Sequence, residues 1–283
     1  MDLCSPVPPR LTDPLPDLAA WTAFCLAAPL PVMDDTALRL EDLRAVEDEV
    51  DAHLIADTVA HDPLMTLKVL AHVAGVRSAR SSGDPETLTS ALVLLGIGPF
   101  FRAFGPQPSV GAHLADLPDA LQGFEAVLRR SNRSAAFALG FAVHRMDPDA
   151  AILHVAALLH DFAELLLWLH APALALRIAQ LQRADPTLRS AQAQRSVLNI
   201  ELPDLQQALL RAWRLPEMLV RIEDDRHADT PQVRNVLLAV RVARHSALDW
   251  DNPALADDVR DIAELLNLGE APARSLLREI DGR

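Results

Sequence analysis

The residues best suited to chemistry are His160 and Asp161, an adjacent histidine and aspartate inside a long apolar segment. Burying a carboxylate costs free energy unless it is hydrogen-bonded, ion-paired or bound to a metal. The doublet is therefore a metal site, a remnant of one, or a structural polar cluster. Glu164 follows His160 at the i, i+4 spacing of one helix face, which can ligate a metal and more often gives an ordinary hydrogen bond.

The segment that carries the doublet, 150–171, reads AAILHVAALLHDFAELLLWLHA. It predicts one helix of about six turns, flanked by Pro148 and Pro172. Apolar residues cover nearly its whole circumference, so the helix is expected to run through the middle of the fold. Its longest unbroken apolar runs, 155–159 and 165–169, are too short to cross a membrane.

The rest of the chain predicts an all-α protein, because no sustained alternation of apolar and polar residues indicates a strand. Nearly every predicted helix begins at a Pro or an Asp. The predicted helices lie near 17–28, 36–60, 62–75, 84–95, 119–145, 149–170, 172–183, 186–198, 203–213, 216–226, 231–248, 257–267 and 270–280.

Proline and glycine divide the chain. Residues 1–16 hold five prolines and are expected to form an extended tail. The stretch 105–118, rich in Pro and Gly, is the best internal break. We therefore expect a single domain over 17–283, with an N-terminal lobe at about 17–104, a linker at 105–118, and a second lobe at about 119–283.

Composition excludes several function classes. Of the 283 residues, 50% are hydrophobic, and the net charge of −13 argues against general binding of nucleic acid. Cys4 and Cys25 are too few and too differently placed for a disulfide framework or a metal knuckle. The start of the chain, MDLCSPVPPR, has no apolar signal core, so a cytoplasmic protein is expected, with no membrane contact.

Four sequence patterns stand in one order along the chain: IADTVAHDPLMTLKVLAHVAG at 55–75, LTSALVLLG at 88–96, AALLHDFAELL at 156–166 and WRLPEMLVRI at 213–222. They resemble, in order and spacing, segments of the HDOD family, the HD-related output domains of bacterial signalling proteins. The third resembles that family's A-G-L-LHDIG-K-L stretch. The resemblance spans about residues 15–250 and implies an HD-domain-like helical bundle with two lobes.

The resemblance also relates the chain to metal-dependent HD phosphohydrolases, which bind metal through a first His, the His-Asp doublet and a later Asp. Only His160 and Asp161 carry over. By the H-S-x-R pattern, Arg130 stands where the first His would lie, and no carboxylate lies near Val240, where the last Asp would fall. An arginine cannot lose its proton to ligate a metal.

These departures predict a remnant HD motif at His160 and Asp161, with no metal, no cofactor and no catalytic residue. Asp161 is expected to pair with Arg130, or Arg130, Asp161 and Glu164 to form an anion pocket. The other polar residues considered for a site are His144, His154 and His170, as extra ligands or core residues, and Arg234, Arg241 and Arg244, as an anion-binding stripe or a solvated face.

Three functions stay open. The favoured one is a non-enzymatic bacterial regulatory protein that acts through a protein partner of a signalling pathway or by sensing a small ligand, with self-association left open. The second is a metal-dependent phosphohydrolase acting on nucleotides or cyclic dinucleotides. The third is a ligand-binding protein that keeps an anion pocket around Arg130 and Asp161.

Overall fold

The computed structural model describes residues 10–76, 85, 87–185 and 187–282, which form helices and connecting turns. Within these ranges the extended residues pair only at one isolated bridge, between Val32 and Ser109, so the described chain holds no sheet. The all-α prediction is confirmed. Cys25 is buried and free, whereas Cys4 and the rest of 1–9 lie outside the described residues.

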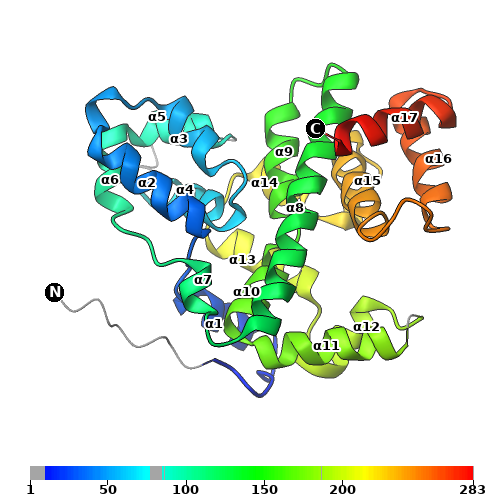
Figure 1. Cartoon of the computed structure of the whole chain (residues 1–283), viewed down its shortest axis with the longest axis horizontal. Coiled ribbons are helices and arrows are strands. Elements are labelled where there is room, and N and C mark those ends of the chain that lie inside the picture. The colour runs from blue at the N-terminus through cyan, green and yellow to red at the C-terminus, as the bar shows by residue number, and fades with distance from the viewer. Residues whose placement is uncertain (1–9, 77–84, 86, 186, 283) are drawn as a thin grey trace.

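The N-terminal lobe, blue to cyan in Figure 1, is a cluster of short helices. They are α2 (Asp34–Ala45), α3 (Ala52–Val59), α4 (Pro63–Val76), α5 (Leu88–Leu95) and α6 (Ile97–Ala103). The predicted start at Asp62-Pro63 is confirmed, because the Asp62 carboxylate accepts from the backbone N–H groups of Leu64 and Met65 at 3.0 and 2.9 Å.

Two predictions in this lobe are wrong. The single helix expected over 36–60 is divided into α2, the 3-10 turn Glu47–Glu49 and α3, because Asp51 caps a new helix by accepting from Leu54 N at 2.8 Å. The helix expected from residue 84 begins at Leu88, since Thr87 caps it through Ser90 N at 3.1 Å. Residue 84 itself lies outside the described ranges.

The second lobe is built around one long helix, α8 (Pro118–His144), which runs through the centre of Figure 1. Against it pack α9 (Ala150–Leu159), α10 (Phe162–His170), α11 (Pro172–Ala184), α15 (Pro231–His245) and α17 (Glu270–Asp281). The remaining helices are α7 (Val110–His113), α12 (Ser190–Leu198), α13 (Leu202–Ala212), α14 (Glu217–Ile222) and α16 (Leu255–Leu266).

The N-terminal segment lies on the second lobe, although the sequence placed it with the first. Helix α1 (Leu18–Ala27) packs against α13, and the indole of Trp21 donates to Leu198 O at 2.9 Å. Ahead of it, Leu11 N donates to His170 O at 2.8 Å. The reason is burial, since Trp21 and Cys25 find their apolar partners there.

The central apolar segment is two helices rather than the one expected. α9 ends at Leu159, a two-residue turn follows at His160 and Asp161, and α10 begins at Phe162. Asp161 has φ −109° and ψ 18°, which lie outside the helical range, so the helix is interrupted at this residue. The stretch Ala150–His170 is long and apolar enough for a membrane span, but 67% of its most apolar 18-residue window is buried, as in a core helix.

Candidate functional site

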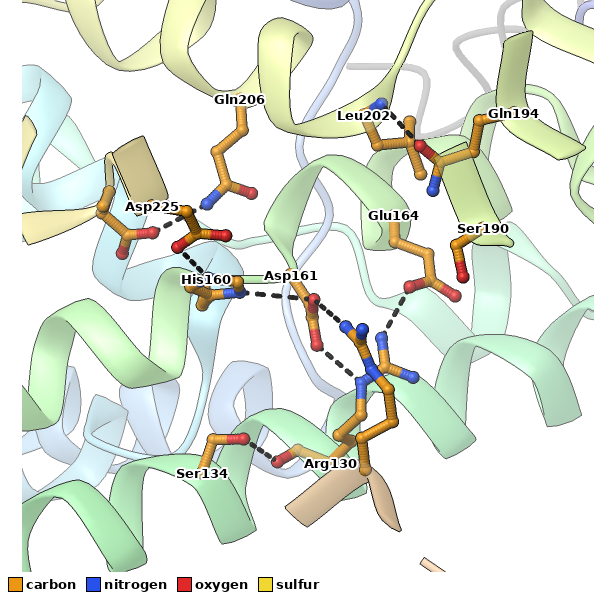
Figure 2. A network of polar contacts seen from close by, with 12 residues as sticks. Arg130, Ser134, His160, Asp161, Glu164, Ser190, Gln194, Leu202, Gln206 and Asp225 are labelled. Atoms are coloured by element: carbon orange, nitrogen blue, oxygen red, sulfur yellow. Dashed lines mark hydrogen bonds and ion pairs between the residues drawn. The ribbon is translucent and has the colours of Figure 1, made fainter. Parts of the chain in front are cut away.

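Arg130 on α8 links the two carboxylates of the α10 start (Figure 2). Its Nε lies 2.6 Å from Asp161 Oδ2, and its Nη2 lies 2.6 Å from Glu164 Oε2. The guanidinium fork is thus shared between two acids rather than placed on one. The structure brings together all three residues that the sequence proposed as a pair or an anion pocket.

Asp161 is buried and surrounded by positive charge. Arg244, from α15, places Nη2 at 3.5 Å from Asp161 Oδ1, whereas Arg130 contacts the other carboxylate oxygen, Oδ2. Burial by itself would raise the pKa of Asp161, but the charges of Arg130 and Arg244 and the contact with His160 hold this pKa well below its ordinary value. Asp161 is therefore ionised throughout the neutral range.

His160 lies between two acids. Its Nε2 is 3.3 Å from Asp225 Oδ1, and its Nδ1 is 3.6 Å from Asp161 Oδ1, which is an ionic contact too long for a hydrogen bond. Burial lowers the pKa of His160, but its contacts with Asp161 and Asp225 outweigh burial and raise the pKa to about 10. At neutral pH both ring nitrogens are then protonated, so a metal would have to displace a proton before it could bind this ring.

Glu223 is a buried acid that the sequence did not single out. The predicted helix 216–226 ends early because Asp224 is extended, which leaves Glu223 facing inward behind α14. Gln206 Nε2 donates to Glu223 Oε2 at 2.7 Å, and burial raises the pKa of Glu223 to about 8. Nothing in the local pattern separates this residue from a surface acid such as Glu217.

These groups line one cavity of about 460 Å³. Its apolar lining comes from α10, α11 and α13, and α11, α12 and α13 add uncharged polar side chains. The apolar wall comprises Leu167, Trp168, Ala175, Ile178, Ala179 and Leu202, and the uncharged polar lining comprises Gln182, Ser190, Gln194, Gln206 and Gln207. The volume lies in the range of small-molecule sites.

Helix α8 holds the apolar wall in place through a glycine. A Cβ atom at Gly123 would lie 2.4 Å from Trp168 Cη2, so the absence of a side chain lets the indole lie flat against α8. Trp168 is 6% exposed and lines the cavity. No sequence pattern connects Trp168 with Gly123, which stand 45 positions apart.

The donor set does not fit the metal that HD phosphohydrolases use. A guanidinium lies where the first ligand would be, His160 is protonated, and Val240 is a buried apolar residue. Among the described residues, no group of three or more His, Cys, Asp or Glu side chains has the arrangement of a metal site. A metal would have to displace Arg130 from Asp161.

The remaining candidate histidines do not join the cavity. His144 is exposed at the end of α8, and His170 is buried against the ring of His113 at 5.5 Å. Burial lowers the pKa values of His154 and His170 to about 4, so both are neutral core residues at neutral pH.

The arginine stripe of α15 has two roles. Arg234 pairs with Glu264 at 2.7 Å, and Arg241 pairs with Asp258 at 2.8 Å and Asp261 at 3.1 Å. These two arginines therefore fasten α16 to α15. Arg244 alone reaches the cavity.

Comparison with known proteins agrees with this architecture. The HDOD domain family model matches residues 30–228. The structure is similar to the MmoQ response regulator of Methylococcus capsulatus str. Bath, with a TM-score of 0.64, 22% identity, and coverage of 89% of this chain and 99% of that one.

A virulence factor of Campylobacter jejuni subsp. jejuni has a similar fold, with a TM-score of 0.63, 17% identity, and coverage of 93% of this chain and 96% of that one. Comparison with curated proteins gives no significant match. The family match covers well over half of the sequence and confirms the resemblance seen in its four patterns. The chain belongs to the HDOD domain family.

Proposed function

We propose that this chain is a non-enzymatic regulatory module of bacterial signal transduction. It works in the cytoplasm, through contact with a protein partner or by sensing a small ligand in the cavity beside Arg130. The observation that carries the proposal is the division of the Arg130 guanidinium between Asp161 and Glu164, each at 2.6 Å. This arrangement satisfies the buried carboxylate of the doublet without a metal.

Hydrolysis of a phosphate ester at an HD-type centre depends on a metal that polarises the phosphoryl group and activates water. Three or four protein ligands are needed to hold such a metal. Of the residues at this position, Asp161 is engaged by two arginines and His160 is protonated. The cavity that remains has the size of a small-molecule site, so it can hold the ligand that the proposal requires.

Metal content and hydrolysis, measured on one preparation, test the proposal. Purified protein dialysed without chelator should hold much less than one equivalent of Mn, Fe, Zn or Ni by elemental analysis. It should also fail to hydrolyse bis-p-nitrophenyl phosphate or cyclic dinucleotides with these metals added. Stoichiometric metal that is lost in His160→Ala, together with turnover, would establish the phosphohydrolase instead.

A further inference from the structure

We infer that the cavity binds a compact organic cation with a planar head rich in N–H donors, an amidinium or a guanidinium, carried on an apolar body. The inference rests on the proposed function, since it names the ligand class of the same cavity. It depends on three features of the cavity lining: its charge, the unpartnered oxygen atoms of Glu223 and Gln207, and its apolar residues.

Acids outnumber bases around the cavity. Seven carboxyl groups line it, against three arginines and one histidine. Each arginine already lies against an acid: Arg130 and Arg244 against Asp161, and Arg226 against Asp204 at 3.5 Å. An anionic ligand would meet this excess of carboxylates, whereas a cation would reduce it.

Two buried side chains of the cavity lining, Glu223 and Gln207, carry an oxygen atom without a hydrogen-bond partner among the described residues, and His160 Nδ1 in the same lining has none either. Glu223 and Gln207 line the cavity and are only 4% exposed each. Within the described part of the chain, the Oε1 atom of each has no hydrogen-bond partner. Buried acceptors of this kind normally have partners, so they point to a ligand that donates. A planar amidinium supplies several N–H donors at a fixed spacing, which suits neighbouring acceptors.

The apolar wall indicates the chemistry of the ligand's body, the part that lies behind its charged head. Trp168, Ile178 and Leu202 belong to the cavity lining. They offer burial for a hydrocarbon or aromatic body, and about 460 Å³ accommodates a molecule of that kind. A bare metal ion or a small inorganic anion would leave this wall uncovered.

Three ligands of equal shape and different head charge test the inference. The full chain is titrated by calorimetry with benzamidine, benzamide and benzoate, and separately with inorganic phosphate. Benzamidine should bind at least about tenfold more tightly than the others, the difference expected for a charge-assisted hydrogen bond.

Two variants of one helix region locate the site. Glu223→Gln keeps the size and polarity of the side chain and should weaken benzamidine binding at least about tenfold. Glu217→Gln removes an exposed acid at the start of α14, outside this cavity, and should leave binding unchanged. Circular dichroism checks the folding of both, and the ligand series on the unmodified chain tests the inference even where Glu223→Gln fails to fold.

The outcomes separate this inference from the proposed function. Binding of benzoate or phosphate as tight as that of benzamidine, or no benzamidine binding at millimolar concentration, overturns the inference. An equal loss in both variants also overturns it. None of these results bears on metal content or hydrolysis, which decide the regulatory proposal on their own.

Discussion

Arg130 Nε and Asp161 Oδ2 lie 2.6 Å apart across the contact of α8 with the start of α10, although 31 positions separate the residues in sequence. Their side chains are 15% and 9% exposed, so the pair is largely shielded from water. Removing one partner of such a pair leaves an uncompensated buried charge. The first prediction therefore concerns the coupling free energy between the two residues, which a single substitution cannot measure.

Arg130→Met and Asp161→Leu should each lower the free energy of unfolding by about 3–5 kcal/mol. The double variant should recover much of the loss, because it leaves less unpaired charge behind. Urea denaturation of the four proteins completes the cycle. The pair Arg234 and Glu264, at 2.7 Å and more exposed, is the control, with an expected coupling of under about 1 kcal/mol. Strictly additive losses at 130 and 161 would show that packing, and not charge, is responsible.

Much of the fold was predictable because local signals decide it. The capping carboxylate of Asp62 acts within three residues, so the start of α4 is visible in the sequence. The division of the central segment at His160 was not predictable from propensity, because Ala and Leu favour a continuous helix. Its turn places the Asp161 carboxylate against Arg130, a contact made by a distant helix.

The part of the site that could be predicted is the part covered by the sequence patterns of the HDOD and HD families. Those patterns placed Arg130 at the position of the first metal-binding His, close to the His160–Asp161 doublet. In the structure Arg130 contacts Asp161. Glu223 and Gln207 escaped notice because their burial arises where α13 and α14 close over the cavity. Glu223 is buried because α14 ends before it, and the spacing of apolar residues does not reveal such a helix end.

Gly123→Ala should destabilise the protein and disturb the cavity wall. The new Cβ atom would overlap the Trp168 ring, whose nearest atom lies 2.4 Å away, and such overpacking costs about 1–3 kcal/mol. The indole can give way only by moving within the cavity wall, so its fluorescence should shift too. Gly75→Ala is the matched control, since a Cβ there meets nothing within 4 Å and alanine favours the helix. Equal stability of the two variants would contradict this account of the wall.

The last prediction concerns stability between pH 6.5 and 8. The pKa of His160 is raised in the folded protein to about 10, from an ordinary value of 6.5. Its contribution to stability is therefore fully present below pH 6.5 and is lost as the pH rises toward 10. The pKa of Glu223 is raised to about 8 from 4.5, so the folded state again holds a proton that the unfolded state has released. Both groups make stability fall with rising pH in this window, each by up to about 1.4 kcal/mol per pH unit.

Urea denaturation at several pH values measures that slope directly. Glu223→Gln should reduce it by removing one of the two titrating groups. His160→Gln should reduce the pH slope by the contribution of the histidine. It should also lower the free energy of unfolding at pH 6.5, because Asp161 and Asp225 lose a positive neighbour. His144→Gln, at an exposed histidine on α8, should leave the slope unchanged. His154 and His170, whose pKa values burial lowers to about 4, contribute a slope of the opposite sign near pH 6.5, so the difference between each variant and the unmodified protein is the quantity to compare. A slope that His160→Gln leaves unchanged would mean that His160 is neutral in the fold. The doublet would then regain a free imidazole, and a metal-binding role would have to be considered again.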